Sequence, residues 1–392
     1  MKKWKPGKVI LACDELREYI KGKKIALMMN TTATGNDGRL LIDTIAEEKW
    51  ADIECFYGME HGVRGNLYAG DGKLSAIDNK TGIRIVNLYD YPRYRPPVEE
   101  VSKVDAVVFC AQDVGVRHWT YTPWLVELIE ACAATNREVI VLDRPNPIRG
   151  DIVEGFPTEE KYMDMELISG FGYPLRHGMT IGELALMYKD IRNIDVKITV
   201  LKMQGWKRDM WYDETGLVWL PGSPNMPTLD TALYFAATGL MQSSTISLGI
   251  GTTTPFQYIG APCFNGDEIA RELNALDIPG VFFVHKYYMA MTYLDPREGA
   301  DRKLTLCDGV MMVINDRNIW RPVTTQLYIM DTLNRLYPGM INFDYHELSR
   351  VRMGTDEICN ALKENRSLLP VIEKWKNSAK EFEKMREKYL LY

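Results

Sequence analysis

Continuous apolar runs alternate with helical patterns through the first half of the chain, and this alternation constrains the fold most strongly. Helical spacing separates several of the runs, for example at residues 38–48 and 124–136. The five apolar runs lie at residues 23–30, 51–58, 83–90, 104–111 and 137–144. Strands that are apolar on both sides are typical of a parallel sheet covered by helices on both faces. The pattern therefore predicts an α/β fold.

The chain is too long for one ordinary hydrophobic core, because it has 392 residues. From about residue 258 the alternation gives way to two longer strand patterns and several helical stretches, the last at 368–391. We predict a larger domain at 1–257 and a smaller α+β domain at 258–392. Within the first domain, Thr180 and Glu183 have the spacing of a helix capping box, which favours a structural role for Glu183.

Composition excludes two classes of partner. The net charge is −6 and the basic residues are scattered, so no nucleic-acid partner is expected. No apolar run approaches the ~18 residues of a membrane span, so no membrane partner is expected.

The seven cysteines form no CxxC motif and no signal peptide is evident. These features predict a cytoplasmic protein with free thiols, or an extracytoplasmic one if a leader has been removed.

Four polar loops follow strands of the predicted sheet, and we call them the rim loops. They span residues 31–38, 59–73, 111–121 and 144–150. Ligands of open parallel sheets bind at the carboxyl ends of the strands. We therefore expect the rim loops to converge on one site.

Several kinds of chemistry lack their sequence signatures. The GIGTTT stretch at 249–254 lacks the third glycine of a dinucleotide fingerprint, and no Walker lysine follows it. The five histidines form no HxH or HExxH motif, and no GxSxG nucleophile elbow occurs. We predict no metal and no cofactor.

Carboxylates remain as the chemically capable groups of the rim loops. Glu60 and Asp71 share a glycine-rich loop with Arg64, Asp113 is followed by Arg117, and Asp143 is followed by Arg144. Two carboxyl groups, one protonated and one ionised, are what hydrolysis of a glycosidic bond requires. The alternative is that these charged pairs only hold the loops together.

Seven motifs, in order along the chain, give the sequence a family resemblance. They are MEHGVRG, AQDVGVRHWTY, VLDRPNP, VEG, RHGMTIGELA, SPNMPTLDTALYF and GTTTPFQYIGAP. From about residue 9 to its end the chain resembles the NamZ-like family, formerly a domain of unknown function. Characterised members are exo-acting β-N-acetylmuramidases that release terminal N-acetylmuramic acid from peptidoglycan fragments. The resemblance implies a Rossmann-like first domain, a smaller second domain, an active site in a cleft between them, and no metal or nucleotide.

The resemblance and the rim loops together predict the site residues. The glutamate of the family's EHG motif falls on Glu60, and Asp71 and Asp113 are the other catalytic candidates. The carbohydrate substrate, a muropeptide or amino-sugar oligosaccharide, is expected to contact His61, Arg64, Arg117, Tyr121, Asp143, Arg144, Asn146, His177, Ser223, Asn225 and Thr252. One of the three arginines is expected to bind the lactyl carboxylate of N-acetylmuramic acid.

The chain also departs from the family's motifs. Asp71 stands in place of a glutamate, and Cys110 stands in place of an aspartate. Further on, three acids and an arginine are replaced by Gln242, Leu248, Ile250 and Gln257.

The rim-loop carboxylates and the family resemblance together predict a glycoside hydrolase acting on a terminal β-linked N-acetylated amino sugar. The alternatives are a related protein that binds such sugars without hydrolysis and a Rossmann-type nucleotide enzyme.

Overall fold

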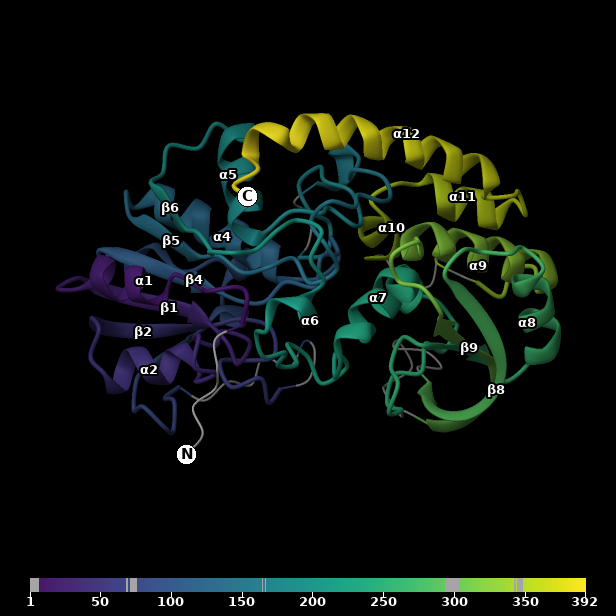
Figure 1. Cartoon of the computed structure of the whole chain (residues 1–392), viewed down its shortest axis with the longest axis horizontal. Coiled ribbons are helices and arrows are strands. Elements are labelled where there is room, and N and C mark those ends of the chain that lie inside the picture. The colour runs from purple at the N-terminus through teal and green to yellow at the C-terminus, as the bar shows by residue number, and fades with distance from the viewer. Residues whose placement is uncertain are drawn as a thin grey trace.

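The computed structural model describes residues 7–67, 70, 76–163, 165, 167–292, 303–341, 343 and 348–392. Within these residues the chain forms a six-stranded sheet and a separate three-stranded sheet, each with its own helices. Figure 1 shows the two sheets side by side, with the C-terminal helix lying across both parts.

The first sheet is parallel throughout, in the order β3-β2-β1-β4-β5-β6. Its strands are β1 (Lys24–Met29), β2 (Asp52–Gly58), β3 (Ile85–Asn87), β4 (Ala106–Cys110), β5 (Glu138–Leu142) and β6 (Ile198–Leu201). The order 3-2-1-4-5-6 is that of a Rossmann-type sheet, in which ligands bind where the strand order reverses. The predicted α/β fold is confirmed.

Both faces of this sheet are buried, which explains the continuous apolar runs. In β1, Ala26 and Met28 face one hydrophobic core, whereas Ile25 and Leu27 face the other. Residues of α4 (Tyr121–Ala134) and α5 (Ile181–Ile191) complete the first core, and residues of α1 (Cys13–Ile20) and α2 (Leu41–Glu47) complete the second. A strand covered on both faces has no solvent side on which polar residues could alternate.

The strand predicted at residues 83–90 is shorter than expected. After β3, the chain turns at once into a 3-10 helix, η1 (Leu88–Asp90). The Asn87 side chain accepts a hydrogen bond from Tyr89 N at 3.2 Å and so begins this turn. Tyr89 therefore lies at the carboxyl end of β3 rather than within the strand.

The shorter connecting elements of the first domain complete its fold. They are η2 (Pro92–Tyr94), α3 (Val98–Val101), η3 (Glu160–Tyr162) and α6 (Tyr212–Thr215). The capping box predicted at the start of α5 is present, because Thr180 Oγ1 accepts from Glu183 N and Glu183 Oε2 accepts from Thr180 N. The structural role predicted for Glu183 is therefore confirmed.

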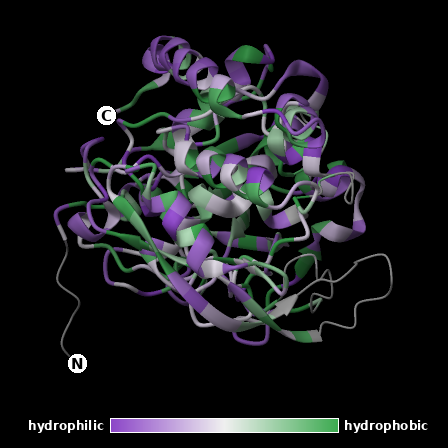
Figure 2. Cartoon of the chain, turned by 90° about the vertical axis from the view of Figure 1, so that its right-hand side faces the viewer, coloured by the Kyte–Doolittle hydropathy of each residue, from purple (hydrophilic) through white to green (hydrophobic). Residues whose placement is uncertain are grey.

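The second sheet is small and antiparallel, in the order β7-β9-β8. Its strands are β7 (Tyr258–Ala261), β8 (Val281–Thr292) and β9 (Lys303–Ile314). The helical elements of this half are α7 (Leu229–Thr238), η4 (Gly239–Ser243), α8 (Gly266–Asn274), α9 (Pro322–Leu336), α10 (Leu348–Met353) and α11 (Glu357–Lys363). Figure 2 looks onto this half and shows many hydrophilic residues on the outer turns of its helices. The predicted smaller α+β part is confirmed, whereas the boundary at residues 257 and 258 stays a prediction.

The C-terminal segment ties the two parts together. Helix α12 (Leu369–Arg386) and η6 (Glu387–Tyr389) run back from the second part to α5 (Figure 1). The Arg386 guanidinium donates to Gly150 O at 2.9 Å and to His177 O at 3.2 Å, and the Tyr392 ring packs on Trp206. Among the described residues, no helix has both the length and the apolar character needed to cross a membrane.

Candidate active site

Loops that follow four neighbouring strands meet at the carboxyl edge of the parallel sheet. Gln112 N, after β4, donates to Thr32 Oγ1, after β1, at 2.8 Å. The Gln112 side chain donates to Pro145 O, after β5, at 2.7 Å. A Cβ on Gly65, in the loop after β2, would lie 2.5 Å from Thr31 Oγ1. The predicted convergence of the rim loops is therefore confirmed for their described residues.

Glu60 lies two residues beyond β2, and two donors hold its half-buried carboxylate. Oε1 accepts from Gly70 N at 2.9 Å, and Oε2 accepts a short hydrogen bond from the Tyr89 hydroxyl. The loop can turn here because His61 and Gly62 both adopt positive φ, at 64° and 75°. Glu60 is therefore presented at the sheet edge as an oriented carboxylate.

The aromatic side chains behind Glu60 fix the position of its hydroxyl donor. The Tyr89 ring packs edge-on against Tyr94 at 5.5 Å and against Trp124 at 5.7 Å. Burial raises the pKa of Tyr89, and the neighbouring Glu60 charge raises it further. The Tyr89 hydroxyl therefore stays protonated and serves as a donor.

Asp113 is the second carboxylate of the site and is almost fully buried. Its Oδ2 accepts from Gly115 N at 2.7 Å and lies 3.2 Å from His177 Nε2, without hydrogen-bond geometry to that nitrogen. His177 Nδ1 accepts from Met179 N at 3.2 Å, so a neutral imidazole carries its proton on Nε2, toward Asp113. Asp113 Oδ1 accepts no hydrogen bond within the described part of the chain. Buried oxygens are normally paired, so Oδ1 is available to a donor from a ligand.

Tyr121 lies near both carboxylates. Its buried hydroxyl donates to Gly222 O at 2.7 Å, which brings the loop before α7 onto the sheet edge. Burial raises the pKa of Tyr121, and the charges of Glu60 and Asp113 both add to this effect. Both acids therefore lie in the electrostatic neighbourhood of the same hydroxyl.

The three predicted arginines all have internal partners. Arg64 donates two hydrogen bonds to Asp78, at 2.7 and 2.6 Å, and one to Asp43 at 2.9 Å. Arg144 is buried and donates to Gln112 Oε1 at 3.0 Å and to Thr34 O at 2.9 Å. Both arginines therefore hold loops together, but through partners other than the neighbouring acids Glu60 and Asp143. Recognition of a substrate carboxylate by one of the three arginines stays a prediction.

Arg117 shows this structural arrangement most clearly. Its buried guanidinium donates to the carbonyl oxygens of Phe156 at 2.6 Å, Tyr173 at 3.1 Å and Met353 at 2.7 Å. Met353 ends α10, so Arg117 joins the first domain to the second part of the chain. Burial lowers the pKa of Arg117 to about 10, so it stays charged at neutral pH.

Asp143 caps the start of α5. It accepts from Thr180 Oγ1 at 2.7 Å, Gly182 N at 2.9 Å and the Tyr392 hydroxyl at 2.9 Å. Burial raises its pKa. Asn146, close by, donates to Met179 O at 3.0 Å. Both side chains therefore support the start of α5, and their predicted contact with substrate stays a prediction.

The remaining predicted residues lie in different surroundings. His61 is buried, with Nδ1 2.9 Å from Leu67 O. Ser223 Oγ accepts from Asn225 N at 3.2 Å in the loop that Tyr121 holds at the sheet edge. Thr252 Oγ1 donates to Gly249 O at 2.6 Å within its own turn. Asp71 lies outside the described residues.

No cluster of three or more His, Cys, Asp or Glu side chains suited to a metal ion occurs within the described residues.

Family models match almost the whole chain. The model of the N-terminal part of exo-β-N-acetylmuramidase NamZ matches residues 25–230, and the model of its C-terminal part matches residues 233–392. The peptidoglycan β-N-acetylmuramidase NamZ of Bacillus subtilis (strain 168) is 35% identical over 378 residues, covering 96% of this chain and 89% of that protein. The chain belongs to the NamZ family.

Solved structures of similar proteins have the same fold. A DUF1343 family protein from Bacteroides fragilis NCTC 9343 superposes with a TM-score of 0.87 and 31% identity, covering 98% of this chain and 99% of that one. A second DUF1343 family protein from the same organism has a TM-score of 0.77 and 28% identity over the same shares of the two chains.

Three of the residues that depart from the expected NamZ family motifs are buried or hydrogen-bonded within the fold. Cys110, at the end of β4, is fully buried, and burial raises the pKa of its thiol. Leu248 is buried in the main core. Gln257 donates to the Tyr234 hydroxyl at 3.1 Å and to Met312 O at 2.9 Å. These replacements leave the bonds around Glu60 and Asp113 in place.

Sequence reasoning missed Tyr89, the donor to Glu60. Residues 83–90 were expected to be one strand, so Tyr89 was not expected to belong to a loop at the carboxyl edge. Asn87 was the available signal, because asparagine commonly begins turns by accepting a hydrogen bond from the backbone two residues on. A strand ending at Asn87 places Tyr89 beside the loop that carries Glu60.

Proposed function

We propose that the chain is a glycoside hydrolase that releases a terminal β-linked N-acetylmuramic acid, or a related N-acetylated amino sugar, from peptidoglycan fragments. The observation that carries the proposal is the Glu60 carboxylate, held at the sheet edge by Tyr89 and Gly70. The B. subtilis relative, a peptidoglycan β-N-acetylmuramidase, supports the choice of substrate.

In this proposal Glu60 acts as a carboxylate, because both of its oxygens accept hydrogen bonds. A carboxylate in this state activates water as a base or attacks the sugar as a nucleophile. Asp113 is the partner carboxyl group in this proposal, because it follows β4 at the same sheet edge and its buried Oδ1 accepts no hydrogen bond within the described residues. Asp71, in the same loop as Glu60, is the second candidate for this partner role.

The ligand of the site is therefore a carbohydrate, and the proposed reaction uses only groups of the chain and water. The cytoplasmic location stays a prediction from the sequence.

Turnover of a chromogenic N-acetylmuraminide, beside its N-acetylglucosaminide analogue, tests the proposal. We expect hydrolysis of the muraminide at a higher kcat/KM than the glucosaminide. Binding of the muraminide without hydrolysis would favour the non-hydrolytic alternative. Neither binding nor hydrolysis of an N-acetylated amino sugar would refute the proposal.

A further inference from the structure

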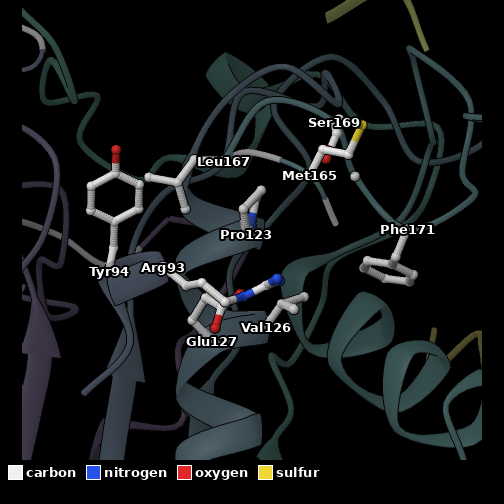
Figure 3. A pocket seen from close by; sticks show the side chains of 10 residues that line it. Arg93, Tyr94, Pro123, Val126, Glu127, Met165, Leu167, Ser169 and Phe171 are labelled. Atoms are coloured by element: carbon white, nitrogen blue, oxygen red, sulfur yellow. The ribbon is translucent and has the colours of Figure 1, made fainter. Parts of the chain in front are cut away.

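A cavity of about 210 Å³ lies beside the first turns of α4, and Glu60 is not among the residues that line it. Figure 3 shows Pro123, Val126 and Glu127 of α4 between Tyr94 on one side and Phe171 on the other, with Leu167 near Tyr94. Sites for drug-sized ligands enclose about 300–1,000 Å³. A cavity of 210 Å³ therefore suits a single small unit, such as one sugar ring.

A partly exposed aromatic path connects this cavity to Glu60. Tyr94 lines the cavity and packs against Tyr89, with 5.5 Å between the ring centroids. Tyr89 in turn donates to Glu60. All three side chains are half-buried, so each presents part of its surface to solvent. Tyr89 and Tyr94 therefore lie between the Glu60 carboxylate and the cavity.

The lining combines apolar walls with one ion pair. Pro123, Val126 and Leu167 contribute aliphatic surface, whereas Arg93 donates to Glu127 Oε1 from Nε at 3.2 Å and from Nη2 at 3.0 Å. An N-acetylated amino sugar offers a matching surface, because its ring face and acetyl methyl are apolar and its hydroxyls both donate and accept. Small-molecule sites have this composition, with mostly apolar walls and a few placed polar groups.

The backbone at the mouth of the cavity is held in an unusual conformation. Arg93 and Tyr94 both have a φ of 59°, which non-glycine residues seldom adopt. The Arg93–Glu127 pair and the packing of Tyr94 on Trp124, at 5.4 Å, hold this conformation. Such conformations cluster at ligand sites.

We propose that this cavity binds the sugar unit on the leaving-group side of the scissile bond, an uncharged N-acetylated amino sugar. The proposal rests on the proposed function, because it takes Glu60 as the point of cleavage. It assigns Arg93, Tyr94 and Glu127 to recognition of the leaving group rather than to the chemical step.

Two substrates that differ only in the leaving group test this assignment. One is the disaccharide of N-acetylmuramic acid linked β-1,4 to N-acetylglucosamine, and the other is β-N-acetylmuraminyl fluoride, whose leaving group is a single atom. Leu167→Trp adds bulk inside the cavity, and Arg93→Ala removes the lining arginine and leaves Glu127 paired with Arg95. Leu369→Trp, at an exposed leucine of α12, is the matched control.

We expect Leu167→Trp and Arg93→Ala to lower the ratio of kcat/KM for the disaccharide to kcat/KM for the fluoride at least tenfold. Leu369→Trp should leave this ratio at the wild-type value. A ratio unchanged in both cavity variants would overturn the assignment.

If wild-type protein hydrolyses neither substrate, the proposed function fails and the cavity is tested by binding alone. N-acetylglucosamine is then titrated and followed by NMR. Binding to the wild type that is lost in Leu167→Trp supports the cavity as a sugar site. Absent binding, or equal binding by both proteins, overturns it.

Discussion

Tyr89→Phe removes the donor to Glu60 and leaves the aromatic packing intact. The phenylalanine ring retains the contacts with Tyr94 and Trp124, so only the hydroxyl is lost. A hydrogen bond to a charged group contributes about 1.5–3 kcal/mol. Since 1.36 kcal/mol corresponds to tenfold in rate, kcat should fall by about 10- to 100-fold. Gly70 N still holds the other oxygen of Glu60, which keeps the loss at the lower end of this range.

The assay is hydrolysis of the muraminide at saturating concentration, with thermal unfolding measured in parallel. Tyr162→Phe is the matched control, because its hydroxyl also donates to a carboxylate, that of Asp356 at 2.5 Å, on the surface away from Glu60. We expect Tyr162→Phe to retain wild-type kcat. A Tyr89→Phe variant with wild-type kcat, or one whose loss is explained by a lower melting temperature, would refute the positioning role.

Three further substitutions give separable outcomes. The bonds from Arg64 hold the pKa of the Asp78 carboxyl group well below its usual range in the folded protein. The stability that these bonds provide is therefore complete at a pH above the pKa of aspartate in the unfolded chain, about 3.9, and is lost as the pH falls below it. Urea unfolding between pH 2.5 and 7 should show less loss on acidification for Asp78→Asn than for the wild type, and equal slopes would contradict this. Arg117→Met leaves the buried carbonyl oxygens of Tyr173 and Met353, and the partly buried one of Phe156, without this donor, and should cost about 2 kcal/mol or more of unfolding free energy, at about 1–3 kcal/mol for each buried oxygen. A stable Arg117→Met protein that has lost only its preference for the muramic sugar would instead assign the arginine to substrate recognition. Asp113→Asn keeps an acceptor for Gly115 N and should lower kcat by about 100-fold or more, the lower end of the range for acid–base groups, so wild-type kcat would exclude Asp113 from the chemistry.

The arrangement of strands and rim loops could be predicted because it follows from local pattern. A strand such as β4 (Ala106–Cys110) is apolar throughout because it is covered on both faces, and polar residues begin just after the strand ends, at Gln112. The Thr180–Glu183 capping box was equally predictable, because both partners lie within one turn. In the capping box the two contacting residues are close in sequence, and in the strands the apolar pattern repeats along the sequence.

Side-chain partners across the fold could not be predicted in the same way. Arg64 pairs with Asp78 and Asp43, which are 14 and 21 residues away, so its loop position alone did not indicate its structural role. Asp143 follows a strand at the carboxyl edge, yet its side chain turns toward Thr180, 37 residues further on. A carboxylate at a strand end accepts whichever donors the packed helices present, and the strand pattern does not specify them.

The kcat of Glu60→Gln on two substrates tests the central claim most directly, namely that Glu60 carries the chemistry as an ionised group. One substrate is the disaccharide, which has a poor leaving group, and the other is the chromogenic muraminide, which has an activated one. Glu99→Gln, an exposed position on α3, is the control for the loss of one carboxylate. We predict that Glu60→Gln lowers kcat by about 10²- to 10⁴-fold on both substrates. A loss confined to the disaccharide would make Glu60 a proton donor and contradict the ionised role, and wild-type rates on both substrates would contradict the entire account.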